Sequence, residues 1–348
     1  MSRRLLSLLL ACCLSAVAHS QSIDWSSSVR SNPAMATMVR GIAEQVVNNV
    51  YVASTILKMQ STVLAAGLNF DCSLFGDHDV CASIAARYTY IRGAGFGDVS
   101  FPDSAQTAGN LQLAFRLNPH WHIGAFYDQG TVIAGVDTYT VKSPQPLLGL
   151  YAVYSATGTE LGLRVRVAAA YGSNTVNMPS DSSGSSASSS RINMQGGQVD
   201  AGYLFGLTED LGLAPFAGLR FAKVSRGAGT ETLGQIVVNY DAIANDALTA
   251  FGGLRLAGRL HPQVSVGLSL GVEQVLQSKL DDYGFSASRI GGFSFNSPQM
   301  NKTSGFVLGT LHYSFDRTQR LSLSLFYTQQ SLDLPSGLTA QVRYSFGF

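Results

Sequence analysis

From Ser83 to the C-terminus, apolar and polar residues alternate along the chain in runs of about ten residues, as in membrane-spanning β-strands. The run at 263–277 is typical, because Val264, Leu268 and Val272 all belong to its apolar face. A period of two with one apolar face predicts a β-strand that is buried on one side. The pattern predicts strands at 83–93, 107–117, 121–129, 147–156, 159–171, 192–207, 211–224, 246–260, 263–277, 303–315, 319–330 and 337–348.

The connections between these strands alternate between short and long. Short ones include 118–120 and 261–262, and long ones include 172–191 and 278–302. Outer-membrane barrels have short periplasmic turns and long extracellular loops, and only closed barrels let strands span lipid. We therefore predict an all-β membrane fold, an antiparallel outer-membrane β-barrel of about twelve strands at 83–348. A secreted β-sandwich is the alternative.

The second face of the strands carries charged residues, which we expect to point into the barrel lumen. They are Arg87, Arg116, Asp128, Glu160, Arg164, Arg166, Arg220, Arg255, Glu273 and Arg343. Arginines outnumber acids on this face, so either the lumen favours anions or the arginines pair with acids and fill it. Aromatic residues at strand ends are expected in the interfacial girdles. They are Tyr88, Tyr90, Trp121, Tyr151, Tyr154, Tyr171 and Tyr344.

The first residues have no strand pattern. Two arginines, an apolar run and small residues at 18–20 predict a secretory signal over 1–20, cleaved before Gln21, with lipoprotein cleavage at Cys12 as the alternative. Asn32 and Pro33 are typical of a helix start. An apolar stripe at helical spacing then predicts a helix over 33–66, which Gly67 is expected to cap. The N-terminal segment 21–82 contains this helix.

Export to an oxidising compartment decides how the remaining cysteines are interpreted. Cys72 and Cys81 enclose a short loop, and we predict a disulfide between them. Asp77, His78 and Asp79 within the loop are expected to form a solvated acidic turn. The sequence therefore predicts no metal site and no cofactor.

Composition excludes other classes of protein. The net charge is +1 and no run of Lys or Arg occurs, so nucleic acid is not an expected partner. Beyond the signal, no apolar stretch is long enough for a transmembrane helix. The sequence brings His120, His122, His261 and His312 into no arrangement with Ser and an acid, so we predict no enzyme.

The motifs at the C-terminal half resemble those of one family. The stretch VDAGYLFGLTEDLGLAPFAGLRFAKVSRGAGTE at 199–231, FGGLRLAGRL at 251–260 and the terminal VRYSFGF are similar to the translocator barrel of autotransporters, the type V secretion proteins. The resemblance implies a location in the cell outer membrane of a Gram-negative bacterium, in contact with its lipid. It also implies that the helix at 33–66 threads the pore.

The resemblance further implies roles for individual residues. Tyr344, Phe346 and Phe348 would form the signal read by the barrel-assembly machinery, after delivery by periplasmic chaperones, and the terminal strand would close against the first. Asn48 and Asn49 are candidates for self-cleavage by inward acids. These acids would be Asp128, Glu160, Asp200 and Glu273.

One departure from the family concerns the passenger. Only about residues 21–32 precede the predicted helix, which is too few for a folded passenger. We therefore expect a translocator barrel or helix-plugged pore with a vestigial passenger or none. A porin-like channel for small solutes is one alternative. A surface adhesin or interaction protein that acts through the long loops is another. The sequence names no cargo, solute or receptor.

Overall fold

The structure is a computed structural model of the chain. It describes residues 57, 59–92, 95–96, 99–100, 103–134, 140–142, 146–157, 161–177, 189–233, 236–288, 291–295, 303–330 and 337–348. The predicted signal, most of the predicted helix, Asn48, Asn49 and Glu160 lie outside these ranges.

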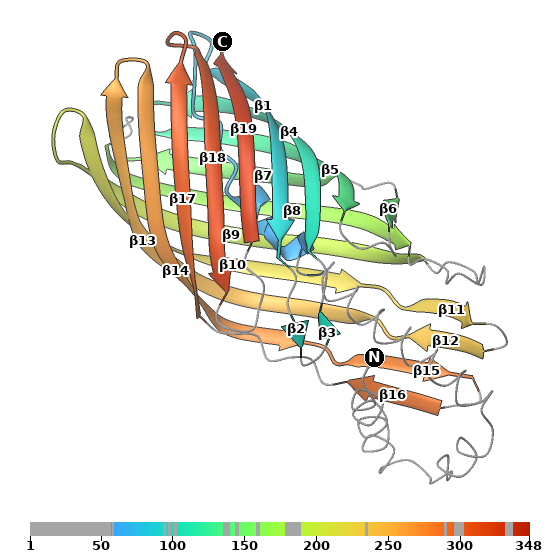
Figure 1. Cartoon of the computed structure of the whole chain (residues 1–348). Coiled ribbons are helices and arrows are strands. Elements are labelled where there is room, and N and C mark those ends of the chain that lie inside the picture. Colours follow the sequence, from blue (N-terminus) through green and yellow to red (C-terminus); the bar gives the residue numbers. More distant parts are fainter. Residues whose placement is uncertain are drawn as a thin grey trace.

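Twelve long antiparallel strands form a closed ring (Figure 1). They are β1 (Val80–Ile91), β4 (Ser104–Asn118), β5 (Trp121–Ala134), β7 (Leu147–Ser155), β8 (Gly162–Asn177), β9 (Ser189–Gly206), β10 (Leu211–Arg226), β13 (Ile243–His261), β14 (Val264–Leu280), β17 (Thr303–Ser314), β18 (Gln319–Gln330) and β19 (Gly337–Gly347). Strands that follow one another around the ring are paired, and β1 pairs with β19, where Ser83 lies opposite Ser345. The predicted barrel and its closure by the terminal strand are confirmed.

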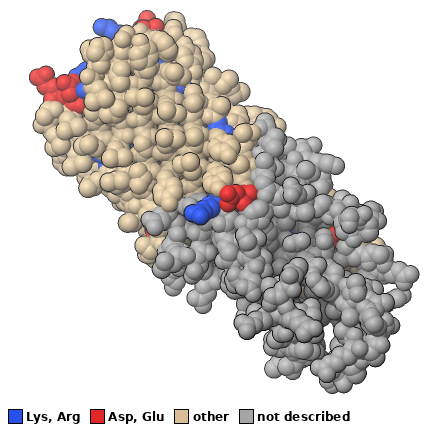
Figure 2. All heavy atoms as spheres, in the orientation of Figure 1, with Lys and Arg blue, Asp and Glu red and all other residues tan. Residues whose placement is uncertain are grey.

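The outer wall of the barrel is apolar. Leucines such as Leu150, which is 67% exposed, cover it, and few charged side chains interrupt the wall in the view of Figure 2. Polar residues such as Asn110, Gln112 and Ser269 lie on the inner face and are buried. This division is what lipid outside and water or protein inside require.

Strand β7 departs from the alternation because both of its faces are apolar. Leu148 and Leu150 point outward, whereas Leu147, Tyr151 and Val153 point inward and are buried. The prediction that Tyr151 lies in an interfacial girdle is therefore wrong, since its side chain is only 4% exposed and faces the lumen. A strand with two apolar faces has no period-two signal, so the sequence does not indicate its parity.

A helix over residues 59–68 lies inside the barrel and covers the inner face of β7 (Figure 1). It continues two residues beyond the predicted end, and Gly67 belongs to the helix instead of capping it. A Cβ atom on Gly67 would lie only 2.7 Å from Leu147 Cδ2. Glycine at this position therefore lets the helix pack closely on the wall.

No helix within the described ranges is both long and apolar enough to cross a membrane.

Two long loops extend beyond the barrel rim and pair with each other (Figure 1). Their strands, which the sequence did not predict, are β11 (Gly229–Leu233), β12 (Ile236–Tyr240), β15 (Tyr283–Ala287) and β16 (Gly291–Phe295), and they form a four-stranded sheet. Glu231 is fully buried on β11 and accepts a hydrogen bond of 3.0 Å from the Tyr240 hydroxyl. The remaining short strands are β2 (Gly95–Phe96), β3 (Val99–Ser100) and β6 (Thr140–Lys142), which pairs with β8.

The two faces of the wall predict losses of stability of different size for the same substitution. Leu268 on β14 points outward, whereas Leu308 on β17 points inward, one residue away in the pairing register. We expect Leu268→Arg to lower the free energy of unfolding by about 2–4 kcal/mol, because it places a charge near the bilayer midplane. Leu308→Arg should lower it by less than about 1 kcal/mol, since an inward cation meets water or protein.

Denaturant unfolding of each variant in lipid vesicles measures both values. Equal losses would contradict the assignment of the two faces.

Candidate functional site

The segment that joins the helix to β1, residues 69–79, runs inside the barrel and is called the pore linker here. Phe70 is buried at the helix end of this segment, and its ring centroid lies 5.2 Å from that of Phe126 on β5. The other end reaches the short-turn rim, where the backbone N–H of His78 donates to the Phe348 carbonyl over 2.7 Å. The pore linker therefore occupies the lumen from the helix to the rim.

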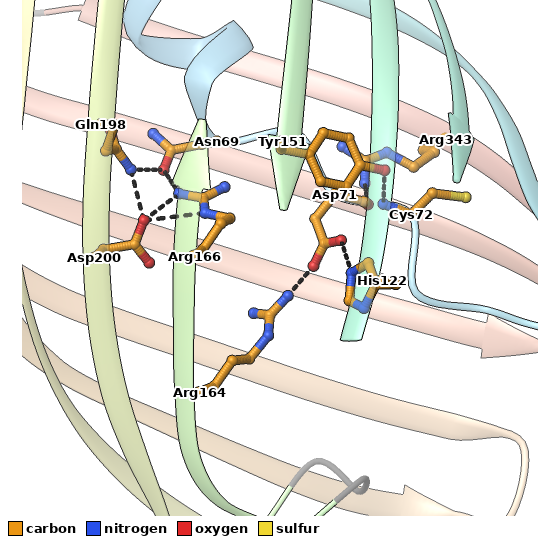
Figure 3. A network of polar contacts seen from close by, with 10 residues as sticks. All are labelled: Asn69, Asp71, Cys72, His122, Tyr151, Arg164, Arg166, Gln198, Asp200 and Arg343. Atoms are coloured by element: carbon orange, nitrogen blue, oxygen red, sulfur yellow. Dashed lines mark hydrogen bonds and ion pairs between the residues drawn. The ribbon is translucent and has the colours of Figure 1, made fainter. Parts of the chain in front are cut away.

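Asp71 is the residue through which three strands hold the pore linker (Figure 3). One carboxylate oxygen lies 3.0 Å from Nε2 of His122 on β5, and the other forms an ion pair with Arg164 on β8. The backbone carbonyl of Asp71 accepts a hydrogen bond of 2.8 Å from Arg343 on β19. The three partner strands belong to one half of the ring, in the order β8, β7, β5, β4, β1 and β19, and together their contacts fix the position of Asp71 in the lumen.

A second cluster holds Asn69, directly after the helix (Figure 3). Its side-chain oxygen accepts hydrogen bonds from Arg166, at 2.7 Å, and from Gln198, at 3.0 Å. Both donors also bind the Asp200 carboxylate, at 2.8 and 3.0 Å. Strands β8 and β9 therefore fix the helix end through a network with a carboxylate at its centre.

The pore linker is also attached covalently to the first strand. Cys72 and Cys81 form a disulfide with their Cα atoms 5.9 Å apart, and both cysteines are buried. The backbone N–H of Cys72 donates to the Tyr151 hydroxyl over 2.9 Å. The inward side chain of Tyr151 therefore packs in the buried apolar cluster with its ring and accepts a hydrogen bond from the pore linker with its hydroxyl.

The structure places most of the predicted inward charges in pairs. Besides the two pairs already described, Arg87 binds Asp128 at 2.7 Å, Arg220 binds Glu273, and Arg116 Nε lies 2.6 Å from Asp79 of the pore linker. Arg255 instead donates to Ser269 over 3.3 Å and lies 5.5 Å from the centre of the Phe216 ring. These contacts favour the second alternative for the inward arginines, in which they pair with acids and fill the lumen.

Several residues of this site were not predicted. Asp71 and Asn69 lie in an irregular segment that has no periodicity, and Tyr151 lies on the strand with two apolar faces. The inward positions of His122 and Asp200 follow from strand alternation, but alternation does not identify their partners. One feature of the sequence could have indicated the site. Asn69 and Asp71 lie between the predicted helix and Cys72, which is expected to be paired, so their segment is tied at both ends.

The described part of the chain contains no group of three His, Cys, Asp or Glu residues that could hold a metal ion. His312 Nδ1 lies 2.8 Å from the Ser322 hydroxyl, a contact that the sequence did not predict. These two residues lie directly opposite each other on β17 and β18, so the contact is a cross-strand pair.

Comparison with known proteins assigns the family. A family model described as "Autotransporter beta-domain" matches residues 85–328, which is most of the chain. The chain belongs to the autotransporter family. It is accordingly an outer-membrane barrel of type V secretion in a Gram-negative bacterium, and the family assigns it to transport and not to catalysis. No curated protein matches it.

Solved autotransporter barrels have the same fold at low sequence identity. The translocator domain of NalP from Neisseria meningitidis is 13% identical with a TM-score of 0.61, and the match covers 86% of this chain and 98% of that one. The transport unit of AIDA-I from Escherichia coli is 12% identical with a TM-score of 0.54, covering 83% and 97%. The β domain of Bordetella BrkA is 15% identical with a TM-score of 0.52, covering 77% and 99%.

The autotransporter pore linker contains a matched pair of aspartates for a test of the site. The Asp71 side chain is 16% exposed and that of Asp79 is 51% exposed, and each pairs with an arginine. We expect Asp71→Asn to lower the free energy of unfolding by about 1–3 kcal/mol, because it leaves buried donors poorly satisfied. Asp79→Asn should cost less than about 1 kcal/mol, since its pair is exposed to water.

Urea unfolding in detergent micelles measures both variants. A cost for Asp79→Asn as large as that for Asp71→Asn would show that Asp71 does not anchor the pore linker.

Proposed function

We propose that this autotransporter barrel is a translocator whose pore is closed by the helix and the pore linker. The simultaneous attachment of Asp71 to β5, β8 and β19 carries the proposal. Apolar contacts alone would let a helix slide along the wall, because they have no preferred direction. The ion pairs and hydrogen bonds of Asp71 and Asn69 select a single position.

The chemistry of these contacts also makes the plug removable. Arg164 is half-buried and its side chain is 36% exposed, so part of its charge is already hydrated. An arginine that loses its carboxylate partner in a wet lumen is hydrated by water, whereas in a dry core it would remain uncompensated. The barrel can therefore retain its fold when the helix and residues 69–71 are displaced, while the disulfide keeps Cys72 attached to β1. Such a displacement is what a translocator requires.

The chain is proposed to divide into three parts. These are a cleaved export signal at 1–20, an N-terminal segment at 21–82 with the plug, and the barrel at 83–348, whose first strand begins slightly earlier, at Val80. Self-cleavage at Asn48 and Asn49 stays a prediction. A vestigial or absent passenger stays one as well.

Assembly of the barrel is proposed to depend on the terminal aromatic residues. Tyr344, Phe346 and Phe348 share the outward face of the terminal segment, and successive ring centroids lie 6.0 and 5.2 Å apart. Phe348 is half-exposed at the short-turn rim, and its N–H donates to the Val80 carbonyl over 2.9 Å. A continuous aromatic row on the lipid-facing side is accessible to the barrel-assembly machinery and to periplasmic chaperones.

Single-channel conductance in a planar bilayer tests the plug. The chain from Gln21 onward should be closed for most of the record, and a variant without residues 21–68 should conduct steadily. Heat-modifiable mobility on gels confirms that both barrels are folded. Equal conductance would contradict the plug and favour a porin-like channel for small solutes.

Removal of Phe348 tests the assembly signal. We expect the amount of folded protein in the outer membrane to fall severalfold, because the terminal ring and the backbone hydrogen bonds of Phe348 with His78 and Val80 are lost. Phe205→Ala is the matched control, since Phe205 is a half-exposed aromatic residue near the end of β9 at the same rim. Similar losses for the two variants would mean that any rim aromatic residue serves, and that the terminal residues are not a signal.

A further inference from the structure

A polar pocket of about 370 Å³ lies on three strands of the barrel near the long-loop end. It is lined by Tyr171 of β8, by Arg191, Asn193 and Gln195 of β9, and by Lys223 and Ser225 of β10. None of these residues contributes to the pore linker or its partners.

The strand register places this pocket on the outer wall. Gln195 lies opposite Tyr171 on one side and opposite Lys223 on the other, and directly paired residues share a face of the sheet. Tyr171 is 53% exposed and points outward, as does Val167 on the same strand. The row through Tyr171, Gln195 and Lys223 therefore faces the membrane side and not the lumen.

The pocket begins where the apolar wall ends. Val167, Val199 and Leu219 form an exposed apolar row across the same three strands. Tyr171 lies four residues further along β8 than Val167, about 13 Å at ~3.3 Å per residue. The pocket thus lies at the rim of the lipid-facing band on the long-loop side, at the depth of the outer-leaflet headgroups.

Two cations flank the pocket. Arg191 Nε donates to the Ser173 hydroxyl over 2.7 Å, and that hydroxyl lies 3.0 Å from the Asn193 side-chain oxygen, so the guanidinium is held in place. No carboxylate pairs with Arg191 within the described ranges. Lys223 pairs with Asp246 on β13 at 3.0 Å. The local charge is therefore positive by one unit, at a depth where a cation on the outer face costs little and can meet an anionic headgroup.

We propose that this pocket binds the phosphorylated headgroup of a glycolipid in the outer leaflet. Arg191, assisted by Lys223, would bind a phosphate, because a guanidinium fork matches phosphate oxygens. The amides of Asn193 and Gln195 and the hydroxyl of Ser225 suit sugar hydroxyls, which a plain phospholipid lacks. Tyr171 lies at the interface depth where tyrosine is enriched.

Lipid binding to the full chain from Gln21, in detergent micelles, tests this site by native mass spectrometry. The probe is lipid A with its two phosphates, and it is compared with dephosphorylated lipid A, phosphatidylglycerol and inorganic phosphate. We expect one lipid A per barrel, with about tenfold weaker binding after Arg191→Gln. Dephosphorylated lipid A should bind the unmodified chain about tenfold more weakly than lipid A does. Its affinity should then equal that of lipid A for the Arg191→Gln variant.

Two further variants control for folding and for general loss of charge. The double variant Lys223→Gln with Asp246→Asn removes the neighbouring ion pair without leaving a lone carboxylate, and it should also weaken lipid A binding. Arg259→Gln removes an exposed arginine at the opposite rim, where it pairs with Asp210, and should leave binding unchanged. Heat-modifiable mobility confirms that each barrel is folded.

Three outcomes would overturn the proposal. The first is equal retention of lipid A by the unmodified chain and by both pocket variants. The second is binding of phosphatidylglycerol as tight as that of lipid A, which would indicate a general attraction for anionic lipid. The third is displacement of lipid A by millimolar inorganic phosphate, which would assign the pocket to free phosphate.

Discussion

Closure of the backbone hydrogen-bond ring is the constraint on which the rest of this structure depends. Lipid supplies no partners for N–H and C=O groups, so the first and last strands must pair along their length. The register between β1 and β19 runs from Cys81 opposite Gly347 to Ile91 opposite Gly337. Closure therefore brings Asp79, the residue before the first strand, and Phe348, the last residue, together on the rim, and the pore linker ends there.

This closure brings the seam, which is the pairing of β1 with β19, into contact with the pore linker. His78 binds the Phe348 carbonyl, and the disulfide of Cys72 ends on Cys81 of the seam strand. Further along the lumen, Arg343 of the other seam strand binds the Asp71 backbone. The pore linker is thus attached to the two strands that close the ring as well as to β5 and β8, while the helix beyond it rests on the apolar wall that includes β7. The covalent attachment of the pore linker and the apolar contacts of the helix favour a plug in which the helix moves while residues 72–79 stay at the wall.

The sequence predicts the parts of the fold that the bilayer enforces and fails where other contacts decide. Strand positions, loop order and closure follow from a period of two and from loop length, since lipid imposes both. The side of Tyr151 did not follow, because the helix makes the inner face of β7 apolar as well. Asp71 was missed because its partners lie 51, 93 and 272 residues away in the chain. No local pattern encodes such contacts, and the paired loop strands were missed for the same reason.

Departures from strand alternation therefore identify what touches the wall. An inner face that is apolar marks protein where water would otherwise be, as on β7 beneath the helix. An outer face that is polar marks the end of the hydrocarbon layer, as in the row through Tyr171, Gln195 and Lys223. At the long-loop rim such a row needs only water around it, but a pocket of about 370 Å³ beside an Arg191 guanidinium that is held in place is more than hydration requires. A preorganised cation beside neutral donors is the arrangement expected for an anionic ligand with hydroxyl groups.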